Sequence, residues 1–234
     1  MVRREGGLVP AEILLDRLPL YTLYQDGRLV YEGPQPAIFP GSLLPSLIQV
    51  DIGADGMAEV MAAIQAAGLP SITELYNTDA NNQVADGPIT EVTFFDANGT
   101  HFFSVYSLLI VEHKDPQVVA LAELMQLLDR LTATSPEIGP FTIERLQVLA
   151  SQNATADDPL AVTVPWPLTI TPASMQEHPF GILCSVADID ENDSALAAFE
   201  QAHQMTFFEL DGITYRLTVR PLLPGEPGCE TFER

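Results

Sequence analysis

Alternation between apolar and polar positions recurs in three stretches of the chain, and each stretch encloses a turn sequence that ends in glycine. The first covers residues 21–31 around Asp26-Gly27. The other two begin with a Thr-Phe-Phe-acidic pattern at residues 93–99 and 206–212. In each, the turn pair, Asn98-Gly99 or Asp211-Gly212, is followed by a run of alternating aromatic and β-branched residues. Such pairs tolerate the positive φ angles of a type I′ turn. We therefore expect three β-hairpins, the first with a two-residue loop.

The two copies of the Thr-Phe-Phe pattern are expected to be covered differently. Pairing outward from the turn of the first copy places Phe95 opposite Phe102 and makes both faces apolar, so we predict that this hairpin is central in its sheet or covered on both sides. Pairing outward from the turn of the second copy gives one apolar face and a second face where Phe207 lies with Arg216. That hairpin is predicted to be half exposed, and Phe207 and Arg216 are candidate binding residues.

Three amphipathic helices are predicted from apolar residues at helical spacing. Asp55 is placed to cap the first, which Gly68 ends. Asp115, followed by proline, starts the second, which ends near Thr132, and the third begins at residue 193 or at Ser194. Their apolar stripes are Met57, Val60, Met61 and Ile64; Leu121, Leu124, Leu128 and Leu131; and Leu196, Phe199 and Ala202. Each helix should therefore pack on a sheet.

These elements predict an α+β fold, with antiparallel sheets built from β-hairpins and amphipathic helices packed on them. Residues 34–45 are too rich in proline for regular structure, and further strands are expected at 47–51, 141–150, 161–164 and 181–186. Residues 132–140 have the composition of a linker. They separate an N-terminal part, 8–134, from a C-terminal part, 140–234. Both contain a helix followed by a hairpin, either through duplication or because two hairpins follow the same turn rules.

The net charge of the chain argues against polyanionic partners. The chain has 234 residues with 47% hydrophobic content, enough for a large core, and 32 acidic against 10 basic residues give a formal charge of −22. Such a charge repels nucleic acid and anionic membrane surfaces, and its simplest role is solvation. No apolar run is long enough to span a membrane, and the first twenty residues lack the apolar core of a signal peptide. Either the protein is cytoplasmic or a signal was removed before residue 1.

Two cysteines, Cys184 and Cys229, flank the third hairpin. An even cysteine count is what a single bridge in an oxidising compartment leaves, and neither cysteine has a Cys-x-x-Cys partner or a neighbouring histidine. We favour a disulfide between them. The alternative is a pair of reduced, buried thiols.

Several short turn and strand motifs together resemble uncharacterised secreted proteins and lipoproteins of actinobacteria. They are Glu-Gly-Gly-Leu-Val-Pro at 5–10, the hairpin around Asp26-Gly27, Phe-Pro-Gly at 39–41, Ala-Gly-Leu at 67–69, and the ending 220–226 with Cys229. The first half, with Tyr-Glu-Gly at 31–33 and residues 86–90, also resembles a bacterial exported domain of unknown function. The resemblance implies an extracytoplasmic location, with a signal or lipid-anchored cysteine before residue 1, and it favours the disulfide. It offers no catalytic residues.

Candidate chemistry is sparse, because no nucleophile elbow, phosphate loop or metal-binding histidine motif is present. Asp188, Asp190 and Asn192 stand at alternate positions in an acidic loop, and such oxygens can converge on calcium, although the loop equally serves to cap the next helix. Trp166 lies between two prolines. It is a candidate for stacking on a sugar or binding a protein partner. The alternative is that it packs at the edge of the core.

The sequence therefore favours a non-enzymatic cell-envelope protein that binds or scaffolds an unknown protein or cell-wall partner through its exposed hairpin and proline-rich loops. No catalytic residues are assigned, and calcium is the one cofactor considered. One alternative is a hydrolase that uses paired carboxylates, for which acidic residues abound but none are paired by spacing. Another is an inhibitor or partner domain of a second exported protein.

Overall fold

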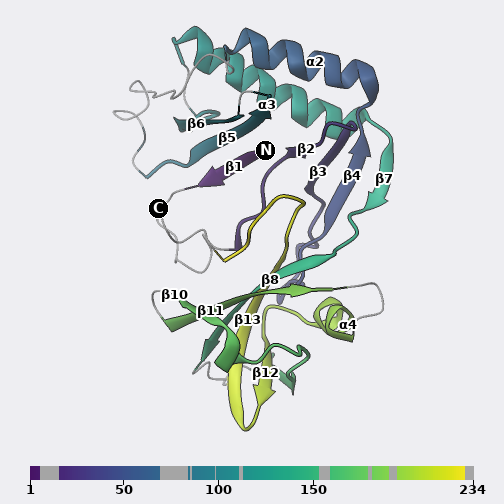
Figure 1. Ribbon diagram of the computed structural model, residues 1–234, viewed down its shortest axis with the longest axis vertical. Helices are drawn as coiled ribbons and strands as arrows, with labels where there is room; N and C mark the ends of the chain where they lie inside the picture. The colour runs from purple at the N-terminus through teal and green to yellow at the C-terminus, as the bar shows by residue number, and fades with distance from the viewer. Residues whose placement is uncertain are drawn as a thin grey trace. The chain divides into compact units, whose positions relative to one another are not determined.

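The computed structural model describes residues 1–5, 16–68, 84, 86–97, 99–110, 113–152, 159–178, 181–189 and 194–229. Within these residues, three α-helices and thirteen strands form an α+β fold (Figure 1), which confirms the predicted class. The chain divides into two compact units: Met1–Gly33 with Leu47–Phe141, and Pro34–Ser46 with Thr142–Arg234. The expected division into 8–134 and 140–234 differs from these units, because it assigned residues 34–46 to the N-terminal part.

The first unit contains two antiparallel sheets. Three strands lie in the order β1-β5-β6, and four lie in the order β2-β3-β4-β7. Their bounds are β1 Val2–Glu5, β2 Thr22–Leu23, β3 Arg28–Glu32, β4 Leu47–Asp51, β5 Ile89–Asp96, β6 Gly99–Tyr106 and β7 Glu137–Pro140. Strand β4 has the bounds that the sequence predicted.

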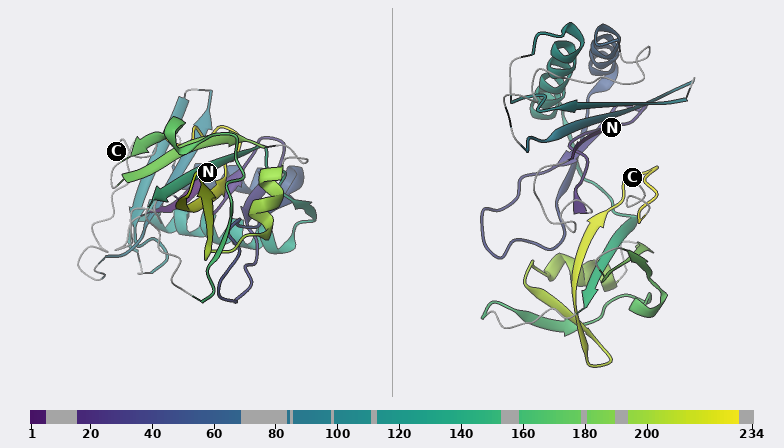
Figure 2. Two further views of the ribbon diagram at one scale, coloured as in Figure 1. Left: turned by 90° about the horizontal axis from the view of Figure 1, so that it is seen from below. Right: turned by 90° about the vertical axis from the view of Figure 1, so that its left-hand side faces the viewer.

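Two helices, α2 (Gly53–Ala66) and α3 (Pro116–Thr134), lie side by side against these strands (Figures 1 and 2). The start of α3 is confirmed, because the carboxylate of Asp115 accepts a hydrogen bond from the N–H of Gln117 at 2.8 Å. Helix α2 begins at Gly53, so Asp55 lies in its first turn and is not its cap, and the carboxylate of Asp51 accepts the N–H of Gly53 at 2.8 Å. The predicted stripes are buried or half-buried, except that Met61 of α2 is exposed.

The first hairpin has a three-residue loop rather than the two-residue loop expected. Leu23 pairs with Leu29, and the N–H of Tyr24 donates to the carbonyl of Arg28 at 2.9 Å, so residues 25–27 form the loop. Gly27 takes a φ of 88°, the left-handed conformation that follows a type I turn in such loops. Nε of Arg28 also donates a hydrogen bond to the carboxylate of Asp26 at 2.7 Å, across this loop.

The second hairpin differs from the prediction in register and in cover. Phe95 pairs with Thr100 and Phe102 with Thr93, and Gly99, which begins β6, pairs with Asp96. A shift of two residues leaves every side chain on its expected face. Only the face bearing Phe103 packs into the core shared with α3, whereas Phe95 is 63% and Phe102 is 36% exposed. The prediction of cover on both sides is wrong, since the helices cover one face of this sheet.

The second unit is built on one six-stranded sheet in the order β10-β11-β8-β13-β12-β9. Its neighbours are antiparallel except β9 and β12, which are parallel. The bounds are β8 Arg145–Gln152, β9 Val162–Pro165, β10 Gln176–His178, β11 Ile182–Asp188, β12 Thr206–Leu210 and β13 Ile213–Pro221, with a short 3-10 helix η2 at Pro172–Ser174 and α4 at Ser194–Gln201.

The third hairpin, β12 and β13, forms as predicted. Asp211 and Gly212 make a two-residue loop with φ angles of 52° and 76°, the positive values that a type I′ turn requires. Phe208 pairs with Tyr215 on the face that α4 covers through Phe199, and the rings of Phe208 and Phe199 meet edge to face at 5.8 Å. The local turn sequence therefore determines this register correctly.

The expected linker at 132–140 is regular structure. Helix α3 continues to Thr134, and β7 pairs with β4, where Gly139 lies opposite Gln49. Proline and glycine are tolerated here because β7 is an edge strand, so composition alone misidentified the segment. The other proline-rich stretch, 34–45, contains no helix, and an isolated bridge joins Ser42 to His203.

Candidate functional site

The C-terminal residues of the second unit turn back after β13 and pack on the sheet face opposite α4. Cys184, Leu149 and Gln147 point to this face, and all three are buried. In the tail, Leu222 and Leu223 are buried as well. A Cβ on Gly228 would come within 2.6 Å of the Val186 side chain, so glycine permits the tail to approach β11 this closely. Residues 222–229 are called the C-terminal tail below.

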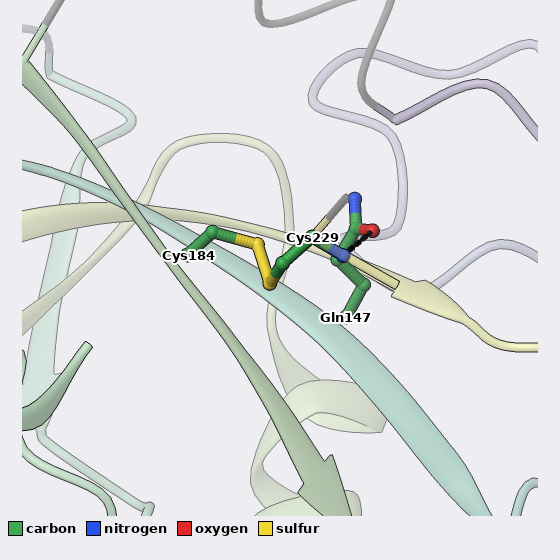
Figure 3. The surroundings of a disulfide bond; sticks show 3 residues. All are labelled: Gln147, Cys184 and Cys229. Atoms are coloured by element: carbon green, nitrogen blue, oxygen red, sulfur yellow. Dashed lines mark hydrogen bonds between the residues drawn. A yellow bond between two sulfur atoms is a disulfide. The ribbon is translucent and has the colours of Figure 1, made fainter. Parts of the chain in front are cut away.

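A disulfide fastens the tail. Cys184 of β11 and Cys229 are bonded, with their Cα atoms 5.8 Å apart and both side chains buried. The N–H of Cys229 also donates to Oε1 of Gln147 at 3.1 Å (Figure 3). The bridge favoured from the sequence is therefore present, and the alternative of two reduced thiols does not describe this structure.

A buried ion pair fixes the start of the tail. Nη1 of Arg220 lies 3.2 and 3.1 Å from the two carboxylate oxygens of Glu226, and the two side chains are only 3% and 4% exposed. Glu226 also accepts the N–H of Leu223 at 2.7 Å, and its carbonyl accepts Nη1 of Arg145 at 3.3 Å. The carboxylate thus holds the turn and compensates a buried positive charge.

His178 lies beside the disulfide on the same sheet face. In the register of β10 and β11, His178 pairs with Ile182 and Gln176 pairs with Cys184, so the His178 and Cys184 side chains are diagonal neighbours. A ring nitrogen of His178 and the sulfurs of Cys184 and Cys229 all lie within 4.8 Å of one another. Burial lowers the pKa of His178, which favours the neutral imidazole. This is the one cluster of metal-ligating residue types found among the described residues.

The proline-rich stretch carries the second candidate site, the loop 34–40. Ile38 and Phe39 are adjacent and 68% and 70% exposed, more than any other large apolar side chain of the described residues. The end of the loop is fastened to the segment after α4, because Gly41 and Gln204 exchange two hydrogen bonds, with the N–H of Gln204 donating to the carbonyl of Gly41 at 2.9 Å. The N–H of Leu43 donates to the carbonyl of Ala202 at 3.1 Å.

The aromatic and basic residues singled out from the sequence are not brought together into one site. Trp166 stacks edge to face on Tyr215 at 5.4 Å, and its indole N–H donates to the carbonyl of Ile170 at 2.9 Å, so it fills the edge of the core. Phe207 is buried, whereas its cross-strand neighbour Arg216 is exposed. Partner binding by these residues stays a prediction.

Two of the three predicted calcium ligands, Asp190 and Asn192, lie outside the described residues. Asp188 is described: its side chain is 93% exposed, and its carboxylate lies 3.8 Å from Nε of Arg145. A hollow of about 110 Å³ lies next to it, lined in part by Pro167 and Ala195. This volume is well below the roughly 300–1,000 Å³ of typical ligand pockets. Calcium binding stays a prediction.

Sequence reasoning missed the partners of the tail and the tip of the loop. The Arg220–Glu226 pair forms because the tail turns back after β13, and His178 approaches the cysteines through the register of β10 with β11 and the return of Cys229 to β11. The spacing of these residues in the sequence gives no signal for either contact. Ile38 and Phe39 could have been found, since two large apolar residues stand together in a stretch too rich in proline to form an amphipathic element.

Comparisons with known proteins leave the chain without an assigned relative. No family model, no curated protein and no solved structure matches it. Among the described residues, no helix is long and apolar enough to cross a membrane.

Proposed function

We propose that this chain is a non-enzymatic, extracytoplasmic binding protein that inserts the tip of the loop 34–40 into an apolar pocket of a protein partner. The observation that carries this proposal is the exposure of Ile38 and Phe39, which stand next to each other at 68% and 70%. Scattered single apolar residues are normal on a protein surface, but an adjacent pair is a binding feature when it projects from a fixed loop.

The loop is suited to binding because its conformation is restricted before a partner arrives. Pro34, Pro36 and Pro40 each fix one φ angle, and the hydrogen bonds of Gly41 hold the end of the loop. A pre-organised loop loses less conformational entropy on binding than a free one, so more of the apolar contact energy appears as affinity. Ile38 and Phe39 therefore have the properties of an interface anchor.

The charge of the chain specifies the chemistry of the partner. A formal charge of −22 attracts a surface with basic residues around its pocket and opposes an anionic membrane. The buried Cys184–Cys229 disulfide supports an oxidising, extracytoplasmic location, in agreement with the resemblance to secreted actinobacterial proteins. The partner we propose is an exported or envelope protein with an apolar pocket and a basic rim.

The test compares the wild type with a variant carrying both Ile38→Ser and Phe39→Ser. Phe95→Ser is the matched control, because Phe95 is 63% exposed and lies on β5. The immobilised wild type is exposed to the envelope and extracellular fractions of the native cell, and a protein that it retains is purified and titrated by calorimetry against the wild type and both variants. The loop variant should bind it at least about 30-fold more weakly, the loss that an anchor residue produces, and Phe95→Ser should bind like the wild type.

Three results would overturn the proposal. The loop variant could bind the purified partner as tightly as the wild type. The wild type could instead bind phosphatidylcholine vesicles in a manner that depends on Phe39, which would make the loop a membrane anchor. The purified protein could turn over ester, glycosidic or peptide substrates, which would favour the hydrolase alternative. A partner that is itself a hydrolase and loses activity in the complex would identify the chain as its inhibitor.

A further inference from the structure

We propose that reduction of the Cys184–Cys229 bridge creates a binding site for zinc or a similar soft divalent metal, formed by both cysteine sulfurs and a ring nitrogen of His178. This site lies in the second unit and does not depend on the proposed function of the loop. The bridge and the metal would exclude each other, since both use the same two sulfurs.

The geometry needs little rearrangement. The three ligand atoms already lie within 4.8 Å of one another. A tetrahedral zinc site, with Zn–S of about 2.3 Å and Zn–N of about 2.0 Å, places its sulfurs about 3.8 Å apart and each sulfur about 3.5 Å from the nitrogen. Once the bond is broken, rotation of the Cys184 and Cys229 side chains can reach these separations. The antiparallel pairing of β10 and β11 keeps His178 beside Cys184 throughout.

The buried position of the site and its ligand types determine which metal it favours. Cys184, Cys229 and His178 are all buried, and an uncompensated charge in such surroundings is costly. Two thiolates, one neutral imidazole and one divalent cation have zero net charge, so the occupied site is electrically balanced. Sulfur and nitrogen ligands favour zinc, cobalt and related metals over calcium and magnesium, which prefer oxygen. A water molecule can complete the tetrahedron.

The chemistry requires a two-electron reductant, and the reductant class that we propose for the cell is a dithiol. The dithiol transfers two electrons and two protons to the disulfide, which becomes two thiols, while the dithiol is oxidised to its own disulfide. Metal binding then releases the two thiol protons as the thiolates coordinate. The metal would hold Cys229, and with it the C-terminal tail, on β11 in place of the covalent bond.

The test is a Co²⁺ titration of the full chain after reduction with a water-soluble phosphine, which binds the metal less than a dithiol does. The reduced wild type should bind one Co²⁺ with a sulfur-to-cobalt charge-transfer band and the visible bands of tetrahedral cobalt. The oxidised protein should show neither. His178→Gln should weaken binding by about tenfold or more, whereas His113→Gln, in the first unit, should have no effect.

Two outcomes would overturn the proposal: a reduced wild type without these bands, or His178→Gln binding cobalt as tightly as the wild type. Circular dichroism of the oxidised variants shows whether each has folded. A second measurement needs no variant, because zinc added to the reduced wild type should shift the imidazole proton signals of His178 in the NMR spectrum. Unchanged signals would reject His178 as a ligand.

Discussion

Removing the carboxylate of Glu226 should strongly destabilise the second unit. In Glu226→Ala, the guanidinium of Arg220 stays buried but loses both oxygens that lie 3.1 and 3.2 Å from its Nη1. The N–H of Leu223, which donates to the same carboxylate at 2.7 Å, loses its acceptor as well. Loss of one partner of a buried ion pair typically costs about 3–5 kcal/mol in the free energy of unfolding.

The double variant Arg220→Met/Glu226→Leu separates the charge effect from the shape of the site. Both charges are then absent, and similar side-chain volumes remain. The Leu223 N–H is left without the carboxylate that it bonds, at a cost of about 1–3 kcal/mol. The double variant should therefore be more stable than Glu226→Ala, and clearly more stable than the sum of its single substitutions predicts.

Urea unfolding followed by tryptophan fluorescence is the appropriate assay. Trp166 is the only tryptophan of the chain and packs at the edge of the core of the second unit, so its emission reports that unit and not the first. The reasoning is refuted if Glu226→Ala loses less than about 1 kcal/mol, or if the double variant loses the sum of the two single losses.

Two further predictions concern the bridge and an alkaline transition. Cys184→Ala/Cys229→Ala should lower the free energy of unfolding by about 4 kcal/mol, from the loop entropy of a separation of 45 residues, and a loss under about 1 kcal/mol in the Trp166 assay would contradict this. The hydroxyl of Tyr21 donates to Asp129, and burial with this bond raises its pKa above the ordinary 10.0. The stability from Tyr21 is therefore present below pH 10.0 and is lost as the pH rises towards the folded pKa. Tyr21→Phe should make unfolding less sensitive to pH in that window, and equal pH dependence would contradict the assignment.

Elements with a local determinant were predictable from the sequence. Helix α3 starts where Asp115 and Pro116 cap it, and the turn at Asp211-Gly212 fixes the register of β12 and β13, because these signals act within a few residues. The second hairpin shows where this logic fails. Asn98-Gly99 suits a turn, but Gly99 begins β6 and pairs with Asp96, so the turn pair alone does not fix the register of β5 and β6.

The candidate sites were less predictable, since they depend on strand register and on the path of the C-terminal tail, for which the sequence carries no local signal. The bridge could be anticipated, because a chain with two cysteines has one possible pair. The neighbourhood of the bridge could not, since His178 reaches it only through the register of β10 with β11, and Gln147 reaches it from β8. The role of Glu226 was also not predictable, because the sequence has many acidic residues and only the fold of the tail brings this one to Arg220.

The membership of residues 34–46 in the second unit affects the order in which the protein can fold. This segment is synthesised before most of the first unit, but Leu43 and Leu44 pack on a core that includes Phe199, and Gly41 bonds to Gln204, 163 residues later. During synthesis from the N-terminus, the segment must therefore wait for almost the whole chain. The two segments of the first unit, before and after residues 34–46, can pair earlier in synthesis, because Glu32 pairs with Leu47. A fragment that starts at residue 142 would lack part of its own core.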